Sequence, residues 1–130
     1  MATDATTPLI ERRIVAGEQN TNVFDDGYFR IEHDNYYIAC GGESITLSLK
    51  EFLIISRLAR NPGRIVASEE IWRYAWGPKG ATNPATLRVH INHLRHKLAP
   101  FKIKIESMVG VGYGLALDGR AGRNNDSKPE

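Results

Sequence analysis

The sequence predicts one α+β domain in which short strands come first, three helices follow and a β-hairpin ends the fold. Three observations predict it. Residues 28–47 contain short runs rich in β-branched and aromatic residues, separated by turn residues. Residues 48–100 carry apolar residues at helical spacing, with start and stop signals for helices. Beyond Pro100, apolar and polar residues alternate, as they do in strands.

The first element expected is a small antiparallel sheet. Its strands are expected at residues 28–32, 36–40 and 43–47. His33-Asp34-Asn35 and Gly41-Gly42 supply the turns between them. Residues 1–22 hold few apolar side chains and are expected to be partly disordered or to supply one edge strand. Cys40 is interpreted as a half-buried strand residue, because no base or cationic helix end lies near it in the sequence.

Two scaffold helices are expected next. In the first, Ser48 and Glu51 form a capping box, and the break at residues 61–63 (Asn-Pro-Gly) ends the helix. Its buried face is expected to carry Leu49, Phe52, Leu53 and Ser56. Residues 64–66 are expected to be a short extended link, and Ser68 to cap the second helix. The core face of that helix is expected to carry Ile71, Trp72 and Ala75. A loop, residues 76–82, follows it.

A third helix is expected from Asn83, a good N-cap followed by Pro84, to a stop at Pro100. An advance of about 100° per residue gathers one apolar stripe. The stripe carries Leu87, Ile91, Leu94 and Leu98. The opposite side carries Arg88, Asn92 and Arg95 on one flank, with Val89, His93 and His96 beside them. This helix therefore presents a cationic, hydrogen-bonding face to solvent.

The charge of the chain is unevenly distributed around that helix. Residues 71–105 hold seven of the 17 basic residues, three of the four histidines, and none of the 15 acidic residues. A face that merely keeps a helix soluble usually mixes both signs of charge, so the missing acids favour a polyanionic partner. A helix that enters the major groove of DNA accounts for both the basic charge and the missing acids.

The chain is expected to end in a hairpin and a tail. Strands around residues 103–106 and 113–117 are joined through residues 109–112. Residues 119–130 are polar and are expected to be disordered, which leaves residues 23–118 as the folded domain. The composition excludes a membrane span, and a lone cysteine without a signal peptide indicates a cytoplasmic protein.

Motifs in this order resemble those of the winged helix-turn-helix effector domain of OmpR/PhoB-type bacterial response regulators. The motifs are Leu47 with Glu51-Phe52, Ser68-Glu69-Glu70-Ile71 with Trp76-Gly77, Thr86-Leu87-Arg88-Val89-His90-Ile91, Leu94-Arg95 with Leu98, and Gly110-Val111-Gly112-Tyr113. The resemblance covers residues 29–117. It implies an N-terminal antiparallel sheet of four strands, a third helix in the major groove, and a hairpin wing on the adjacent backbone or minor groove. The chain lacks room for the receiver domain that precedes this domain in the family.

The resemblance and the outward face of the third helix together give a set of expected DNA contacts. The resemblance implies that Thr86 contacts a phosphate at the start of the third helix and that Trp76 contacts the DNA backbone from the preceding loop. It also implies that Arg95 contacts DNA and that Tyr113 is a contact of the wing. The complete set is Trp76, Thr86, Arg88, Val89, Asn92, His93, Arg95, His96, Lys102, Lys104 and Tyr113. Arg88 departs from the family, which commonly has an acid there, and Val109 and Gly114 stand where the wing usually carries arginines. Base preference is therefore not inherited, and Lys102 and Lys104 are expected to compensate for the missing wing arginines.

Other chemistries find little support in the sequence. His90, His93 and His96 step by about 60° around the helix, and no nearby Cys or carboxylate completes a metal site. The glycine-rich run at residues 110–114 precedes a strand rather than a helix, so it is no phosphate-binding loop. No catalytic serine, cysteine or carboxylate pair is evident, so neither an enzyme nor a cofactor is expected.

The function predicted from the sequence is sequence-specific binding of double-stranded DNA by a transcriptional regulator. The alternative is a winged-helix module that binds an acidic protein partner, an interpretation that the missing wing arginines favour. By analogy with the family, RNA polymerase is a candidate partner. The same analogy suggests a monomer alone and a tandem dimer on direct-repeat DNA.

Overall fold

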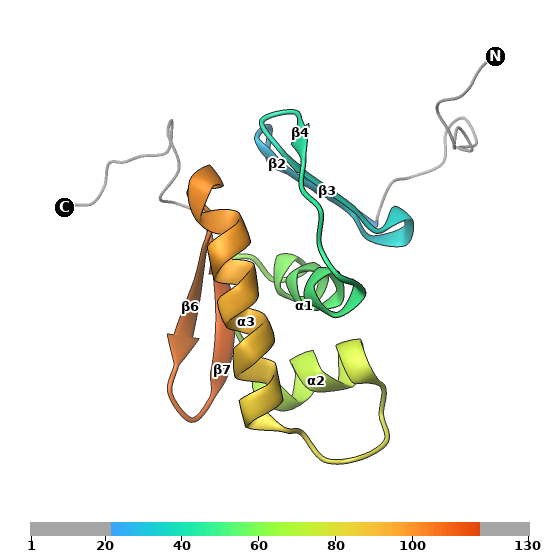
Figure 1. Ribbon diagram of the computed structural model, residues 1–130, viewed down its shortest axis with the longest axis vertical. Coiled ribbons are helices and arrows are strands. Elements are labelled where there is room, and N and C mark those ends of the chain that lie inside the picture. The colour runs from blue at the N-terminus through green and yellow to red at the C-terminus, as the bar shows by residue number, and fades with distance from the viewer. Residues whose placement is uncertain (1–21, 118–130) are drawn as a thin grey trace.

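The computed structural model describes residues 22–117, which form an α+β domain of two antiparallel sheets and three α-helices (Figure 1). The strands are β1 (Val23–Asp25), β2 (Phe29–Glu32), β3 (Tyr37–Cys40), β4 (Glu43–Ser44), β5 (Ile65–Ala67), β6 (Lys104–Met108) and β7 (Gly112–Ala116). The helices are α1 (Leu49–Ala59), α2 (Ser68–Trp76) and α3 (Pro84–Leu98), with short 3-10 turns η1 (His33–Asn35) and η2 (Ala99–Phe101). The expected winged helix-turn-helix architecture is confirmed. The expectations for residues 1–21 and 118–130 lie outside the described residues.

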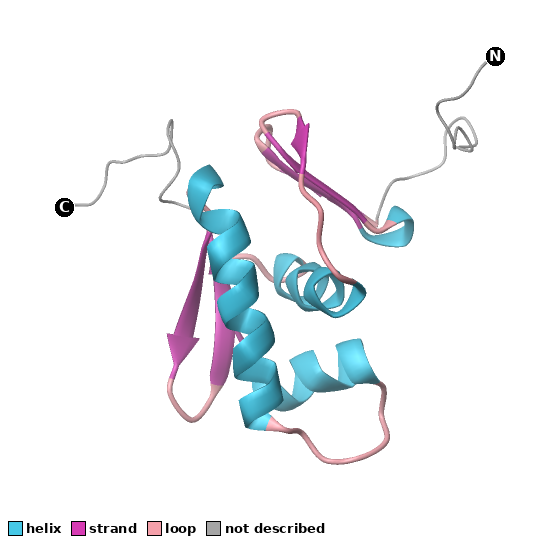
Figure 2. Cartoon of the chain, in the orientation of Figure 1, coloured by secondary structure: helices cyan, strands magenta, loops and turns pink. Residues whose placement is uncertain are grey.

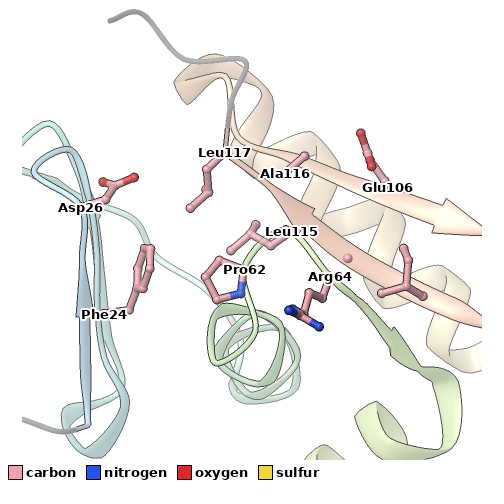
Figure 3. Close-up of a pocket in the computed structure, with 11 residues that line it drawn as sticks. Phe24, Asp26, Pro62, Arg64, Glu106, Leu115, Ala116 and Leu117 are labelled. Carbon is pink, nitrogen blue, oxygen red and sulfur yellow. The ribbon is translucent and has the colours of Figure 1, made fainter. Parts of the chain in front are cut away.

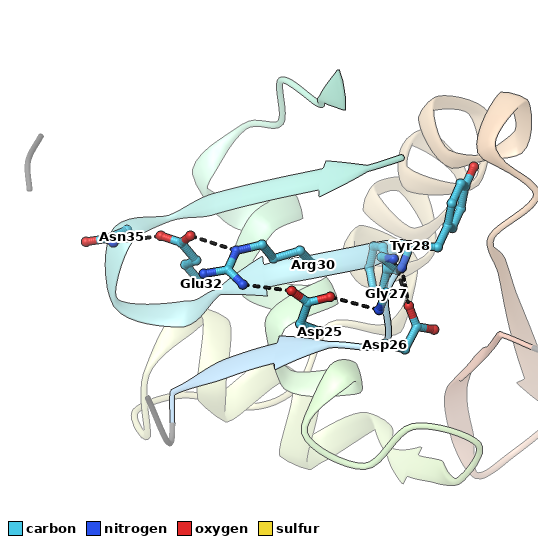
Figure 4. A network of polar contacts seen from close by, with 8 residues as sticks. Asp25, Asp26, Gly27, Tyr28, Arg30, Glu32 and Asn35 are labelled. Atoms are coloured by element: carbon cyan, nitrogen blue, oxygen red, sulfur yellow. Dashed lines mark hydrogen bonds and ion pairs between the residues drawn. The ribbon is translucent and has the colours of Figure 1, made fainter. Parts of the chain in front are cut away.

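The N-terminal sheet has four strands in the order β1-β2-β3-β4. Strand β1 was not predicted as a separate strand, and β4 ends at Ser44, earlier than expected. Figure 4 shows how β1 is tied to β2. Arg30 on β2 pairs with Asp25 on β1 at 2.8 Å, and Asp26 accepts hydrogen bonds from the backbone N–H groups of Tyr28 and Phe29 in the turn. This ion pair and the turn hold the short edge strand in register.

The second sheet has the order β5-β7-β6 and contains the expected hairpin. The extended conformation expected at residues 64–66 is confirmed, since residues 65–67 form β5, but the pairing of this strand with β7 was not predicted. Close pairing requires glycine at two positions of β7. A Cβ on Gly112 would lie 1.9 Å from the carbonyl oxygen of Val66, and one on Gly114 would lie 2.5 Å from that of Arg64. The glycine-rich run thus supplies both the hairpin turn and this contact.

The helix starts agree with the prediction at two of three places. The capping box of Ser48 and Glu51 is present in both directions. Asn83 caps α3 by accepting a hydrogen bond from the Thr86 N–H at 3.0 Å. Ser68, however, is the first residue of α2 and not its cap. Because β5 runs directly into α2, the Ser68 N–H donates to the Val111 carbonyl in the wing instead.

The core lies between the helices and the two sheets, which occupy different sides of α1 (Figure 2). Leu49 was expected in it but is 58% exposed, because it stands at the first position of α1 on the solvent side. The expected Phe52 and Ser56 are buried, and the buried residues of α1 also include Glu51, Ile54, Ile55, Leu58 and Ala59. Within residues 22–117, no helix combines the length and apolarity that crossing a membrane requires.

Candidate nucleic-acid interface

Helix α3 divides into a buried and an exposed side, as the sequence predicted. Leu87, Ile91, Leu94 and Leu98 are almost fully buried. The exposed residues are Pro84, Ala85, Arg88, Val89, Asn92, His93, His96 and Lys97. Within the described part of the chain, Arg88 makes no side-chain hydrogen bond or ion pair. Its guanidinium is therefore available to a ligand.

The exposed flank of α3 faces the wing across a groove. The groove is lined by Ser68, Glu69, Thr82, Pro84, Arg88, Asn92, Arg95 and residues 107–113. Figure 1 shows why: the β6–β7 hairpin runs beside α3, and its turn lies near the N-terminal end of the helix. Arg88, Asn92, Arg95 and Tyr113 thus share one surface, as expected for a site. The sequence did not indicate that Glu69 or the apolar tip of the wing (Met108, Val109 and Val111) belongs to this surface.

Arg95 joins α3 to the wing. Its Nε donates to the Ile105 carbonyl at 2.9 Å, and its Nη2 donates to Ser107 Oγ at 2.6 Å. The guanidinium also lies 6.0 Å from the ring centre of Tyr113. Nη1 reaches Asn92 Oδ1 at 3.4 Å. Arg95 therefore fixes the hairpin against the helix, with only part of its hydrogen-bonding capacity left for a ligand.

Trp76 is the last residue of α2, although it was expected in the following loop. Its ring stacks on that of Trp72 with centres 3.9 Å apart. His90 meets it edge-on, and Lys50 Nζ lies 5.2 Å from its centre. His90 also hydrogen-bonds the Thr86 carbonyl. This cluster joins α2 to the first turns of α3 through His90.

The basic segment has acidic neighbours from elsewhere in the chain. Glu51 is buried, accepts a hydrogen bond from Lys97 Nζ at 2.7 Å, and lies 3.7 Å from His93 Nδ1. Burial opposes ionisation of Glu51, but the hydrogen bonds from Lys97 and Ser48 outweigh it, so the pKa of Glu51 lies below its ordinary value. The acid-free stretch of sequence is therefore not an acid-free surface on this side of α3.

Four further residues of the expected contact set are Thr86, Tyr113, Lys102 and Lys104. Thr86 and Tyr113 are half-buried, while Lys102 and Lys104 are exposed beyond the C-terminal end of α3. Lys104 and the acidic Glu106 alternate with buried Ile105 on β6 and so point to the same side. Lys102, Lys104 and Arg95 contribute to a separate hollow, distinct in position from the wing tip.

Other possible sites offer less chemistry. Among residues 22–117, no three His, Cys, Asp or Glu side chains gather as metal ligands would. A hollow between β1 and β7 has Phe24, Pro62 and Leu117 on its walls, with Asp26, Arg64 and Glu106 around it (Figure 3). None of its lining residues belongs to the expected contact set. Arg88, Asn92 and Arg95 of α3 line the groove beside the wing, so this groove is the candidate interface.

Comparison with known families decides what kind of domain carries this surface. The family model described as "Transcriptional regulatory protein, C terminal" matches residues 42–115, which is more than half of the chain. The chain belongs to this family. The domain is thus an OmpR/PhoB-type effector domain, and its resemblance to that family is confirmed. Family membership also confirms the predicted function, sequence-specific DNA binding by a transcriptional regulator.

Curated relatives of this effector domain are bacterial regulators. The sensory transduction protein RegX3 of Mycobacterium tuberculosis is 31% identical over 103 residues, which are 78% of this chain and 45% of the relative. The DNA-binding dual master transcriptional regulator RpaA of Synechocystis is 30% identical over 113 residues, 85% of this chain and 47% of the relative. The chain spans about half the length of these relatives.

Solved structures show the same fold. The DNA-binding domain of Klebsiella pneumoniae RstA, solved in complex with RstA box, superposes with a TM-score of 0.61 at 26% identity. That alignment covers 72% of this chain and 96% of the RstA chain. The DNA-binding domain of Escherichia coli CpxR has a TM-score of 0.63 at 20% identity, covering 72% and 95% of the two chains. The CpxR likeness concerns the fold alone.

Proposed function

We propose that this effector domain recognises its DNA sequence with α3 in the major groove and the β6–β7 wing on the adjacent backbone or minor groove. One observation carries the proposal. Arg88 and Asn92 are exposed on the flank of α3 that faces the wing groove. Arginine pairs with the O6 and N7 atoms of guanine, and asparagine pairs with adenine, so these two side chains are suited to base recognition.

The other expected contacts receive supporting roles in this arrangement. Arg95 holds the wing in place through Ile105 and Ser107, and a DNA contact is proposed for the N–H groups that these bonds leave over. Contacts to backbone and flanking groove are proposed for Trp76, Thr86, Val89, His93, His96, Lys102, Lys104 and Tyr113. Contacts of this kind set register and supply affinity, and they carry little sequence information.

Titration with duplex DNA at two salt concentrations tests the proposal. We expect the affinity for random duplexes to fall as salt rises, with a slope of about 0.9 in log–log units for each phosphate contacted. Selection of bound duplexes from a random library should then yield a defined half-site. Absence of binding to any duplex at low salt would contradict the proposal and favour the alternative of an acidic protein partner.

The whole regulator's partners are also a matter for proposal. We propose RNA polymerase as a protein partner, action in the bacterial cytoplasm, and binding as a monomer that pairs in tandem on direct repeats. Support comes only from analogy with the family. The selected duplexes test the tandem arrangement, because a direct repeat at fixed spacing would be recovered if two domains bind side by side.

A further inference from the structure

A buried carboxylate from α1 lies beside the exposed face of α3. The side chain of Glu51 is only 5% exposed, and its Oε1 accepts a hydrogen bond from Lys97 Nζ at 2.7 Å. Its Oε2 lies 3.7 Å from His93 Nδ1. Lys97 and His93 stand one helical turn apart, and both are exposed. Two of the nitrogen-bearing side chains on this side of α3 therefore meet the same carboxylate.

The start of α1 holds Glu51 in this position. Its Oε1 also accepts a hydrogen bond from the Ser48 N–H at 2.9 Å, and its own N–H donates to Ser48 Oγ at 3.2 Å. Burial opposes ionisation, but the hydrogen bonds from Lys97 and Ser48 keep the pKa of Glu51 below its ordinary value of 4.5. A fixed negative charge therefore stands against α3 at neutral pH.

Lys97 is the partner that can leave this ion pair. Its side chain is 42% exposed, and its ammonium stands at the end of a flexible stem. Its departure would leave the Glu51 carboxylate buried without a cation, which costs free energy. Glu51 therefore opposes transfer of Lys97 to any other anion. Arg88, on the wing side of α3, has no such restraint, since it makes no side-chain hydrogen bond or ion pair among residues 22–117.

We propose that Glu51 competes with DNA phosphate for Lys97 and so lowers the affinity of the domain for every duplex, whatever its sequence. The proposal rests on the DNA-binding mode proposed above. A helix in the major groove has a phosphate backbone along each flank, and Lys97 lies on the flank next to α1, away from the wing. Phosphate contacts supply affinity without sequence information. Glu51 therefore weakens sequence-independent binding and leaves base recognition by Arg88 and Asn92 unchanged.

Glu51→Gln tests this role, because glutamine also serves at the third position of a capping box and removes only the charge. The probes are the tightest-binding duplex recovered by the selection described above and a random duplex. We expect the variant to bind both about threefold to tenfold more tightly than the parent, with a log–log salt slope steeper by about 0.9, because Lys97 gains a phosphate contact. The ratio of the two affinities should stay the same.

Two further variants sharpen the test. Glu70→Gln is the matched control, because it removes the same charge from an ion pair with Arg57 on α1, away from α3, and it should leave the salt slope unchanged. Lys97→Gln alone should bind within about twofold of the parent, since Glu51 already withholds this cation. In the Lys97→Gln background, Glu51→Gln should no longer raise the affinity. Thermal melting checks that each variant folds.

The outcomes separate the two proposals. If the parent binds no duplex at low salt, the proposed function fails. If the parent binds and Glu51→Gln has the same affinity and salt slope, only the role of Glu51 is overturned. Weaker binding by a folded Glu51→Gln domain would overturn it too, since Glu51 would then position Lys97 for phosphate. Should Glu51→Gln fail to fold, Lys97→Gln decides: a large loss of affinity would show that Lys97 already contacts DNA in the parent.

Discussion

Arg88 and Asn92 give the sharpest prediction at the scale of single residues. Both are exposed on α3 and far from the apolar core, so Arg88→Ala and Asn92→Ala should change the free energy of unfolding by less than about 0.5 kcal/mol. Each should cost about 1 to 3 kcal/mol of discrimination between the selected site and one with a single substituted base pair. Competition titrations measure this. Equal weakening on all sequences would instead assign these side chains to the DNA backbone.

The sequence could place side chains on α3 but could not identify their partners. Helical periodicity correctly separated buried Leu94 from exposed Asn92. It could not show that Arg95 bonds to β6, or that Lys97 meets Glu51, which lies 46 residues away. Such partners depend on tertiary packing. They matter for the proposed function, because Glu51 offsets the charge of Lys97 and the bonds to β6 occupy N–H groups of Arg95.

At the scale of elements, the sequence predicted the bounds of a helix well where capping and stop residues mark its ends. Helix α3 was predicted well because Asn83, Pro84 and Pro100 mark its ends within the sequence itself. The sequence indicated the extended conformation of β5 but not its pairing, since its partner β7 lies near the other end of the domain. Ser68 was misplaced for the same reason: its backbone N–H bonds to the wing rather than standing at a free helix end.

The contact between β5 and β7 leads to a prediction about the wing. Gly112→Ala should destabilise the domain by at least about 2 kcal/mol, because its Cβ would meet the Val66 backbone, which cannot rotate away. Met108→Ala is the matched control: Met108 pairs with Gly112 on the other side of β7 and is largely exposed. It should change stability by less than about 0.5 kcal/mol. Urea unfolding distinguishes the two, and equal midpoints would contradict the contact.

At the scale of the whole molecule, one polar network joins the N-terminal sheet to the helices. His33 in η1 is buried, and its Nδ1 hydrogen-bonds Ser56 Oγ in α1. Ser56 Oγ lies 3.2 Å from the hydroxyl of Tyr74 in α2, and Arg60 packs over the Tyr74 ring. From the sequence, His33 was interpreted only as a turn residue. Its role at this junction became evident once η1, α1 and α2 were placed together.

Burial makes this junction sensitive to pH. Desolvation, followed by the charge of Arg60, lowers the pKa of His33 below its ordinary value of 6.5, and Asp34 only partly opposes them. The native state therefore binds the proton less readily than the unfolded chain does. The contribution of His33 to stability is complete above pH 6.5 and is lost as pH falls through the lower, folded pKa.

His33→Gln isolates this effect, because it keeps a hydrogen-bonding side chain that does not titrate. The variant should be about 1 kcal/mol less stable at pH 7, from a poorer hydrogen bond to Ser56. Between pH 6.5 and pH 5 the parent should lose stability while the variant loses less, so the two curves converge. Carboxylates such as Glu51, whose ordinary pKa is 4.5, titrate mainly below this window. Urea unfolding at pH 7, 6 and 5 measures the difference. Parallel curves would mean that His33 is protonated as easily in the folded domain as in the unfolded chain.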